Sequence, residues 1–174
     1  ADTVDGSLWV ALLARPRERP EEVRPVIGGR VLNLGILPAV ETDGRTLFPL
    51  GTPVAGARPS LRYEIATDRT DPATGAPLYD RLEAEAEDDV LSEPGVVKLR
   101  LPPAERLGLW EITEPLVKGS GDFPPSLEDD AEEARVVTWI RLRLTENSTG
   151  GGLRARVGWV GVNAARIIQR ANVT

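Results

Sequence analysis

The chain has 174 residues, a length at which one domain can bury roughly 70% of the surface that its unfolded chain exposes. Its residues are 41% hydrophobic and 28% charged, and no apolar run reaches the ~20 residues that span a bilayer, which argues against wholesale disorder and against membrane insertion. The net charge of −6 argues against nucleic acid as a partner, because such binding needs an excess of Lys and Arg to neutralise phosphates.

Residue 1 is Ala, the sequence contains no Met, and its first residues lack the charged, apolar and small-residue regions of a signal peptide. We therefore interpret residues 1–174 as a single domain excised from a longer protein that assembles in the cytoplasm. The sequence also contains no Cys, so stability must come from packing rather than from disulfides.

Alternation of apolar and polar residues recurs along the chain and predicts short antiparallel strands. Residues 7–14 are apolar on both faces, which is typical of a central strand that is covered on both sides. Residues 31–37 have a weaker form of the same pattern. Between them, Pro20 and two acids resemble a helix start, but we expect Pro25 to interrupt that helix within a turn.

The middle of the chain predicts two strands that each cover one side of a core. At residues 61–66 the odd-numbered side chains, beginning with Leu61, are expected to face inward, while Arg62 and Glu64 face water. Residues 97–101 repeat this pattern, with apolar residues at the odd positions and basic residues between them. Helix is expected to be minor throughout.

The clearest alternation lies in the last third of the chain. Residues 136–144 predict one strand, and residues 153–159 predict a second. The intervening residues 147–152 include three glycines, which supply the positive φ angles that a hairpin loop requires, so we expect the two strands to pair. Trp159 is expected to lie in the core. Residues 103–107 predict one further helical turn.

Charge is segregated along the sequence. Residues 83–93 and residues 122–133 each contain six carboxylates, whereas residues 135–170 contain seven arginines and one acid. One interpretation is that acidic loops pair loosely with an arginine-bearing sheet face; the other is that this face binds a partner. The candidate partner-binding residues share or border one face of the predicted hairpin: Arg141, Arg143, Arg154, Arg156 and Trp139.

The residue types needed for most enzymatic chemistry are absent. Without His and Cys, the chain cannot form a Ser-His-Asp triad, a papain-like pair or a zinc site built from those ligands. Carboxylates are plentiful, but pairs such as Asp88 with Asp89 occur in predicted loops without an aromatic platform for a sugar. We expect no catalytic residue, no cofactor and no metal. Calcium bound by Asp68 and Asp71, or by residues 128–130, is the alternative to solvated acids.

Four tryptophans raise the alternative of a carbohydrate-binding module, because aromatic rings on a β-sandwich can stack against sugars. Trp9 and Trp159 lie in apolar alternation and are expected in the core. Trp139 is ambiguous, since it shares a predicted face with Arg141 and Arg143 and could stack beneath a guanidinium group. A glycan contact therefore stays open.

The order of several motifs resembles one protein family. The motifs are LWVALLA at residues 8–14, the Pro-Glu-Glu-Val stretch that follows, VLNLG at 31–35, GVVKLRLP at 95–102, FPPSLED at 123–129, WIRLR at 139–143 and VGVNA at 160–164, with Gln169 near the end. This series is similar to the inserted domain of baseplate assembly proteins of the baseplate J-like family, found in phage tails and contractile injection systems. Residues 68–90 are longer and more acidic than that family's pattern.

The resemblance implies an antiparallel β-sandwich, jelly-roll-like, with one or two short helical turns at most. It implies a non-catalytic structural domain that contacts other baseplate and tail proteins and becomes part of a phage-tail-like particle, and it supplies no catalytic residues. The alternative of a carbohydrate-binding module predicts instead an exposed aromatic strip or a concave groove.

Overall fold

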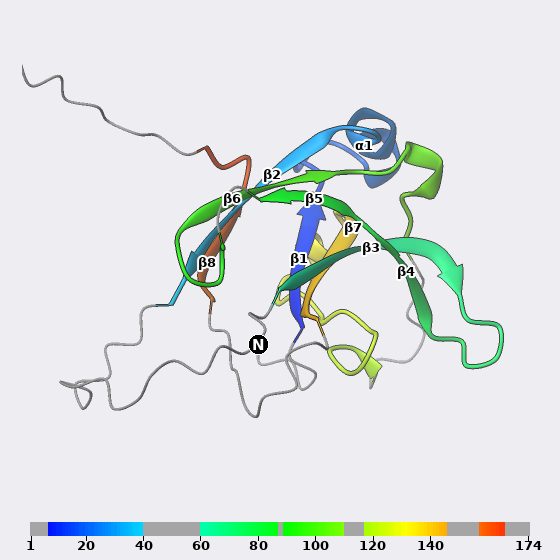
Figure 1. Cartoon of the computed structure of the whole chain (residues 1–174). Coiled ribbons are helices and arrows are strands. Elements are labelled where there is room, and N and C mark those ends of the chain that lie inside the picture. The colour runs from blue at the N-terminus through cyan, green and yellow to red at the C-terminus, as the bar shows by residue number, and fades with distance from the viewer. Residues whose placement is uncertain (1–6, 40–59, 87–88, 110–116, 146–156, 166–174) are drawn as a thin grey trace, which may run out of the picture. The chain divides into compact units, whose positions relative to one another are not determined.

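The computed structural model describes residues 7–39, 60–86, 89–109, 117–145 and 157–165 (Figure 1). The protein is mostly β-structure and forms two antiparallel four-stranded sheets, consistent with an all-β sandwich. The predicted all-β class is thus confirmed, whereas the jelly-roll connectivity stays a prediction. No helix in the described ranges is long and apolar enough to cross a membrane.

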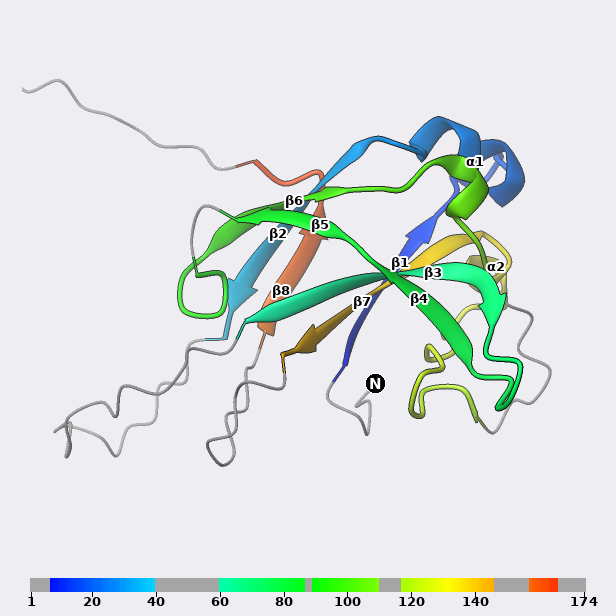
Figure 2. The ribbon, with the colours of Figure 1, turned by 45° about the vertical axis from the view of Figure 1, so that its right-hand side comes forward.

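Each sheet combines strands from distant parts of the sequence, as Figures 1 and 2 show. The first sheet has the order β1 (Leu8–Leu13), β7 (Val136–Leu144), β3 (Leu61–Thr70) and β4 (Pro77–Arg81). The second has the order β5 (Glu83–Ala86), β6 (Gly95–Arg100), β2 (Val31–Pro38) and β8 (Val157–Val162). The helical elements are α1 (Pro20–Ile27), η1 (Ala104–Arg106) and α2 (Asp130–Glu133).

The chain divides into two compact units, each containing most of one sheet. Unit 1 takes its described residues from 1–30, 59–83 and 100–146, and unit 2 takes them from 31–58, 84–99 and 147–174. Both units are therefore assembled from three separate stretches of sequence. The prediction of a single domain over residues 1–174 stays a prediction.

Helix α1 is longer than the sequence suggests. Pro20 occupies its first turn, where a missing N–H group costs nothing because the first four N–H groups of a helix have no intrahelical partner. The helix then continues through Pro25 to Ile27, so the expectation that Pro25 ends it is wrong. Pro25 removes only one backbone donor, and the helix still closes with the Gly28 N–H donating to the Arg24 carbonyl at 3.0 Å.

Strand β7 lies between β1 and β3, so the predicted hairpin with the next strand is wrong. Ile140 is the register partner of Val10 on β1 and of Ile65 on β3. Strand β8 pairs instead with β2, where Leu37 is opposite Trp159. Strand β7 is buried along seven of its nine residues and therefore needs a neighbour on each side. Strand β1 is correspondingly an edge of its sheet rather than the central strand that its sequence predicts.

The buried side chains confirm part of the alternation. On β6 and just after it, Val97, Leu99 and Leu101 are at most 4% exposed, while the basic residues between them point outward, as expected. On β3, Tyr63 and Ile65 are buried as predicted. The largest fully buried apolar side chains come from both sheets: Leu34, Ile36, Val97 and Leu99 from the second, and Ile65, Val137, Ile140 and Leu142 from the first.

Candidate functional site

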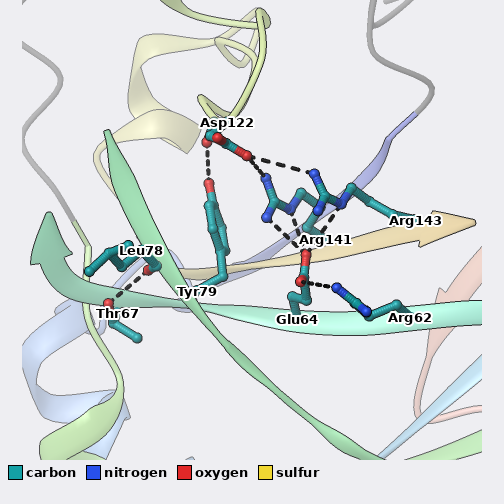
Figure 3. Close-up of polar contacts among 8 residues, drawn as sticks. All are labelled: Arg62, Glu64, Thr67, Leu78, Tyr79, Asp122, Arg141 and Arg143. Carbon is teal, nitrogen blue, oxygen red and sulfur yellow. Dashed lines mark hydrogen bonds and ion pairs between the residues drawn. The ribbon is translucent and has the colours of Figure 1, made fainter. Parts of the chain in front are cut away.

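Among the described residues, a dense group of charged side chains surrounds Arg141 in unit 1 (Figure 3). The Arg141 side chain is only 4% exposed. Its Nε donates a hydrogen bond to Glu64 Oε2 at 2.9 Å, and a terminal nitrogen lies 2.8 Å from the same oxygen. The other terminal nitrogen donates to Asp122 Oδ1 at 2.5 Å. One guanidinium group thus joins β7, β3 and the loop that carries Asp122.

Two aromatic rings lie close to this guanidinium group. Its central carbon lies 3.8 Å from the centre of the Tyr79 ring and 5.5 Å from the Trp9 ring, distances suited to cation–π attraction. The Tyr79 hydroxyl donates to the backbone carbonyl of Asp122 at 2.5 Å. Burial raises the pKa of Tyr79 above its ordinary value, more than the nearby Arg141 charge lowers it, so the phenol is neutral and remains a donor.

A second arginine contacts the same acids from the rim of the group. Arg143 is 39% exposed, and its Nε lies 3.5 Å from Glu64 Oε2 while a terminal nitrogen lies 3.7 Å from Asp122 Oδ1. Arg62 approaches the other oxygen of Glu64 at 3.9 Å. Three guanidinium groups therefore surround two carboxylates in this part of the described chain, which explains why Glu64 is only 8% exposed although the sequence predicts it in water. That prediction is wrong.

We call Arg141, Arg143, Glu64, Asp122 and Tyr79 the arginine cluster. Its central cation has acid partners on two elements and rings beside it, so it serves as a structural link between strands and a loop rather than as a free group for chemistry. Of the two interpretations of the segregated charge, intramolecular pairing is the one found at Arg141, and it is close and buried rather than loose.

The predicted arginine face is therefore not assembled as the sequence suggests. Arg141 is too buried to contact a partner, and only Arg143 of the described arginines in that set is partly exposed. Trp139 is 6% exposed and belongs to a buried apolar cluster with Ala66 and Val136, where Trp9 meets it edge-on at 6.2 Å between ring centres. The choice of Arg141 and Trp139 as surface residues is wrong, because β7 is covered on both faces.

Trp159 in unit 2 is exposed, in contrast to the buried Trp139. It is 54% exposed, so its expected place in the core is wrong. Its ring lies against two glycines: a Cβ added to Gly161 would be 2.2 Å from the ring, and one added to Gly35 would be 3.0 Å from it. A side chain at Gly161 would displace the ring, so this glycine permits the indole to lie along the sheet.

The Trp159 ring forms one wall of an apolar groove of about 410 Å³. The other walls come from β2, through Gly35 and Leu37, and from Gly95 and Val96 at the start of β6. Every lining residue is apolar or glycine. Sequence reasoning missed this groove, although the pairing of Gly35 with Gly161 in neighbouring strands was a usable signal once the register was known.

A second hollow, of about 380 Å³, lies in unit 1 and is charged. Asp80 lines it and accepts hydrogen bonds from Arg69 at 2.7 Å and from Arg106 at 2.6 Å. Both arginines are more than half exposed, so these pairs contribute little to stability. Asp80 thus already pairs with both arginines that line this hollow.

Two of the carboxylates considered for calcium, those of Asp71 and Asp129, have local backbone roles. Asp71 Oδ1 accepts the Ala73 N–H at 2.8 Å in the turn between β3 and β4. Asp129 Oδ1 accepts the Ala131 N–H at 2.8 Å and caps α2. Across the described residues, no three His, Cys, Asp or Glu side chains gather into a group that could hold a metal ion.

The remaining partner-binding candidates, Arg154 and Arg156, lie outside the described residues, as does Trp110, the fourth tryptophan of the sequence. The described residues thus offer two candidate sites. One is the arginine cluster in unit 1, whose charges are paired, and the other is the open apolar groove in unit 2. Neither a protein-family model, nor a curated protein, nor a solved structure matches this chain.

Proposed function

We propose that this chain is a non-catalytic assembly domain of a baseplate protein in a phage-tail-like contractile injection particle. In this role it is made in the cytoplasm and then contacts other baseplate and tail proteins within the particle. The order of sequence motifs suggests the family, and one structural observation supports contact with proteins. Trp159 and its register partner Leu37 are 54% and 43% exposed beside the apolar groove of unit 2.

Exposed aromatic and aliphatic side chains next to a groove are the usual anchors of a protein interface. The arginine cluster supports the same role indirectly. Its charges are matched inside unit 1, and Tyr79 is kept neutral by burial, so the cluster stabilises the fold without offering an activated nucleophile. The proposal therefore requires no cofactor.

The test uses the source organism and a tag on this chain. Particles containing sheath and tube proteins are purified by centrifugation and analysed by mass spectrometry. We expect the chain to co-purify in constant proportion to the sheath. Leu37→Lys should reduce its incorporation, whereas Val31→Lys, a similarly exposed position of the same strand, should not. Particles that lack the chain, or full incorporation of Leu37→Lys, would contradict the proposal.

A carbohydrate-binding module is the second candidate, and Trp159 is the observation that favours it. Its exposed indole lies beside a hollow of the size of a small ligand, as a sugar-stacking platform requires. Apart from the indole N–H of Trp159, the lining offers only backbone groups as polar partners, which is a weak basis for selecting a sugar. Glycan-array binding that disappears in Trp159→Ala and persists in Val31→Ala would favour this candidate over assembly.

A further inference from the structure

We infer that β8 pairs antiparallel with β8 of a second copy of this chain, so that the second sheet continues across a two-fold axis. Strand β8 is the last strand in the order β5-β6-β2-β8, and β2 is its hydrogen-bonded neighbour. Among the described residues no strand pairs with its other edge. An open edge presents backbone N–H and C=O groups that another extended strand can satisfy.

The edges of the two sheets differ in charge. Strand β5 carries Glu83 and Glu85, and β4 carries Asp80 and Arg81. Charged side chains on an edge discourage pairing with another chain. Strand β8 has the sequence VGWVGV and contains no charged residue. Strand β1 is also uncharged, but its tryptophan packs against the buried cluster of unit 1, whereas the tryptophan of β8 is exposed.

The sequence of β8 is complementary to itself about Val160. When Val160 lies opposite its own copy, Trp159 lies opposite Gly161, and Gly161 lies opposite Trp159. The two indoles then come from the same face but from diagonal positions, which large side chains can bridge without direct collision. Because each indole lies over Gly161 of its own strand, the two rings would pack side by side across the two-fold axis.

The net charge of the chain also favours the edge of β8 as the place where two copies meet. Two copies that each carry a net charge of −6 repel one another, and an uncharged strand lets them meet where no like charges are opposed. Salt screens the long-range repulsion and leaves the apolar contact, so association should strengthen as salt increases. A pair of six-residue strands buries little surface, and the dimer should accordingly be weak and dependent on concentration.

The inference does not depend on the proposed particle, and its test uses the purified chain alone. Sedimentation equilibrium over a range of concentrations measures dimer formation by the wild type, by Trp159→Lys, by Trp159→Glu and by an equimolar mixture of the two variants. The matched control is Val31→Lys, which places a charge at a 51% exposed position of β2, outside the residues of β2 that pair with β8. Thermal melting verifies that each variant is folded.

We expect the wild type to dimerise and each Trp159 variant to associate at least about tenfold more weakly, since like charges then lie at the centre of the contact. The mixture should recover association, because Lys and Glu attract across the two-fold axis, and Val31→Lys should behave as the wild type. If the Trp159 variants fail to fold, Val162→Lys places a charge at a 44% exposed position of the same strand, opposite Gly158 of the partner in this register, and should also weaken association.

A wild type that stays monomeric at every concentration would overturn the inference, as would a mixture that does not regain association. If Trp159→Lys dimerises as strongly as the wild type, the two copies do not meet at β8 and the inference is wrong. A Trp159→Lys chain that loses the dimer but still enters particles would support the β8 contact and show that the assembly role does not require it.

Discussion

The two sheets contain strands with similar alternation of residues but with different burial of their side chains. Strand β7 of the first sheet alternates apolar and basic residues, yet both of its faces are covered, and Trp139 and Arg141 lie inside. Strand β8 of the second sheet also alternates, yet Trp159 lies half in solvent. The comparison teaches that alternation determines which residues share a face, whereas the neighbouring strands and loops determine whether that face is covered.

The largest expected effect comes from reversing the charge at the centre of the arginine cluster. Arg141→Glu would place three carboxylates together in a buried space, with Glu64 left without its closest cation. Breaking a buried ion pair costs about 3 to 5 kcal/mol, so we expect severe destabilisation or failure to fold. Urea unfolding followed by circular dichroism measures it.

The matched control for that experiment is Arg69→Glu. Arg69 also bonds a carboxylate, that of Asp80, but its side chain is 60% exposed, and exposed pairs are worth about 0.2 to 1 kcal/mol. If Arg141→Glu unfolds no more easily than Arg69→Glu, then Arg141 lies at the surface and the contrast between the sheets is lost.

Truncating the two tryptophans tests the contrast directly. Trp139→Ala removes a buried ring from the apolar cluster and should cost about 3 to 5 kcal/mol, while Trp159→Ala removes a ring that is already half exposed and should cost clearly less. Denaturant melts of the two variants give the order. The reverse order would mean that the faces of β7 and β8 are assigned the wrong way round.

Alkaline titration tests whether the two tyrosines of unit 1 are buried. Burial raises the pKa of Tyr63 to about 12 and raises that of Tyr79 as well. These neutral phenols contribute stability that is fully present below the ordinary tyrosine pKa of about 10 and is lost as pH rises through the folded-state values. Near-ultraviolet absorbance should show tyrosinate forming at higher pH in the folded protein than in urea. Tyr63→Phe should raise the pH of alkaline unfolding, and coincident titration curves would contradict the burial of both tyrosines.

The smallest effect is expected at the rim of the arginine cluster. Asp122→Asn removes the charge that faces Arg141 but keeps the backbone carbonyl that accepts the Tyr79 hydroxyl. The Asp122 side chain is 47% exposed, so the loss should be about 1 kcal/mol. Urea melts provide the measurement. A loss as large as that of Arg141→Glu would show that Asp122, rather than Glu64, is the essential partner.

The sequence predicts the strands better than it predicts their neighbours. The fold class, the positions of most strands and the buried residues of β6 follow from local alternation. The pairing of β7 with β1 and β3 does not, since it joins segments far apart in the chain and the sequential neighbour, β8, belongs to the other sheet. Pro25 within α1 shows the same limit for helices, because the lost donor is tolerated by the surrounding structure.

The candidate site is less predictable than the fold for a related reason. Arg141 and Glu64 each look solvent-exposed from their own strands, and only the register between β3 and β7 brings them opposite one another. Tyr79 and Asp122 join them from two further segments. The apolar groove likewise depends on Gly35 meeting Gly161 across β2 and β8, which no local pattern specifies.

The central claim is that Arg141 and Glu64 form a buried, mutually dependent pair, and a double-mutant cycle tests it most directly. Arg141→Met and Glu64→Leu are measured singly and together by urea unfolding, beside a reference cycle made with Arg69→Ala and Asp80→Ala, in which the arginine is 60% exposed. Each buried single variant should lose about 3 to 5 kcal/mol, while the double variant should be far more stable than the sum predicts, because neither charge is left unpaired. The reference cycle should show coupling of less than about 1 kcal/mol. Additive losses for Arg141→Met and Glu64→Leu would contradict the account.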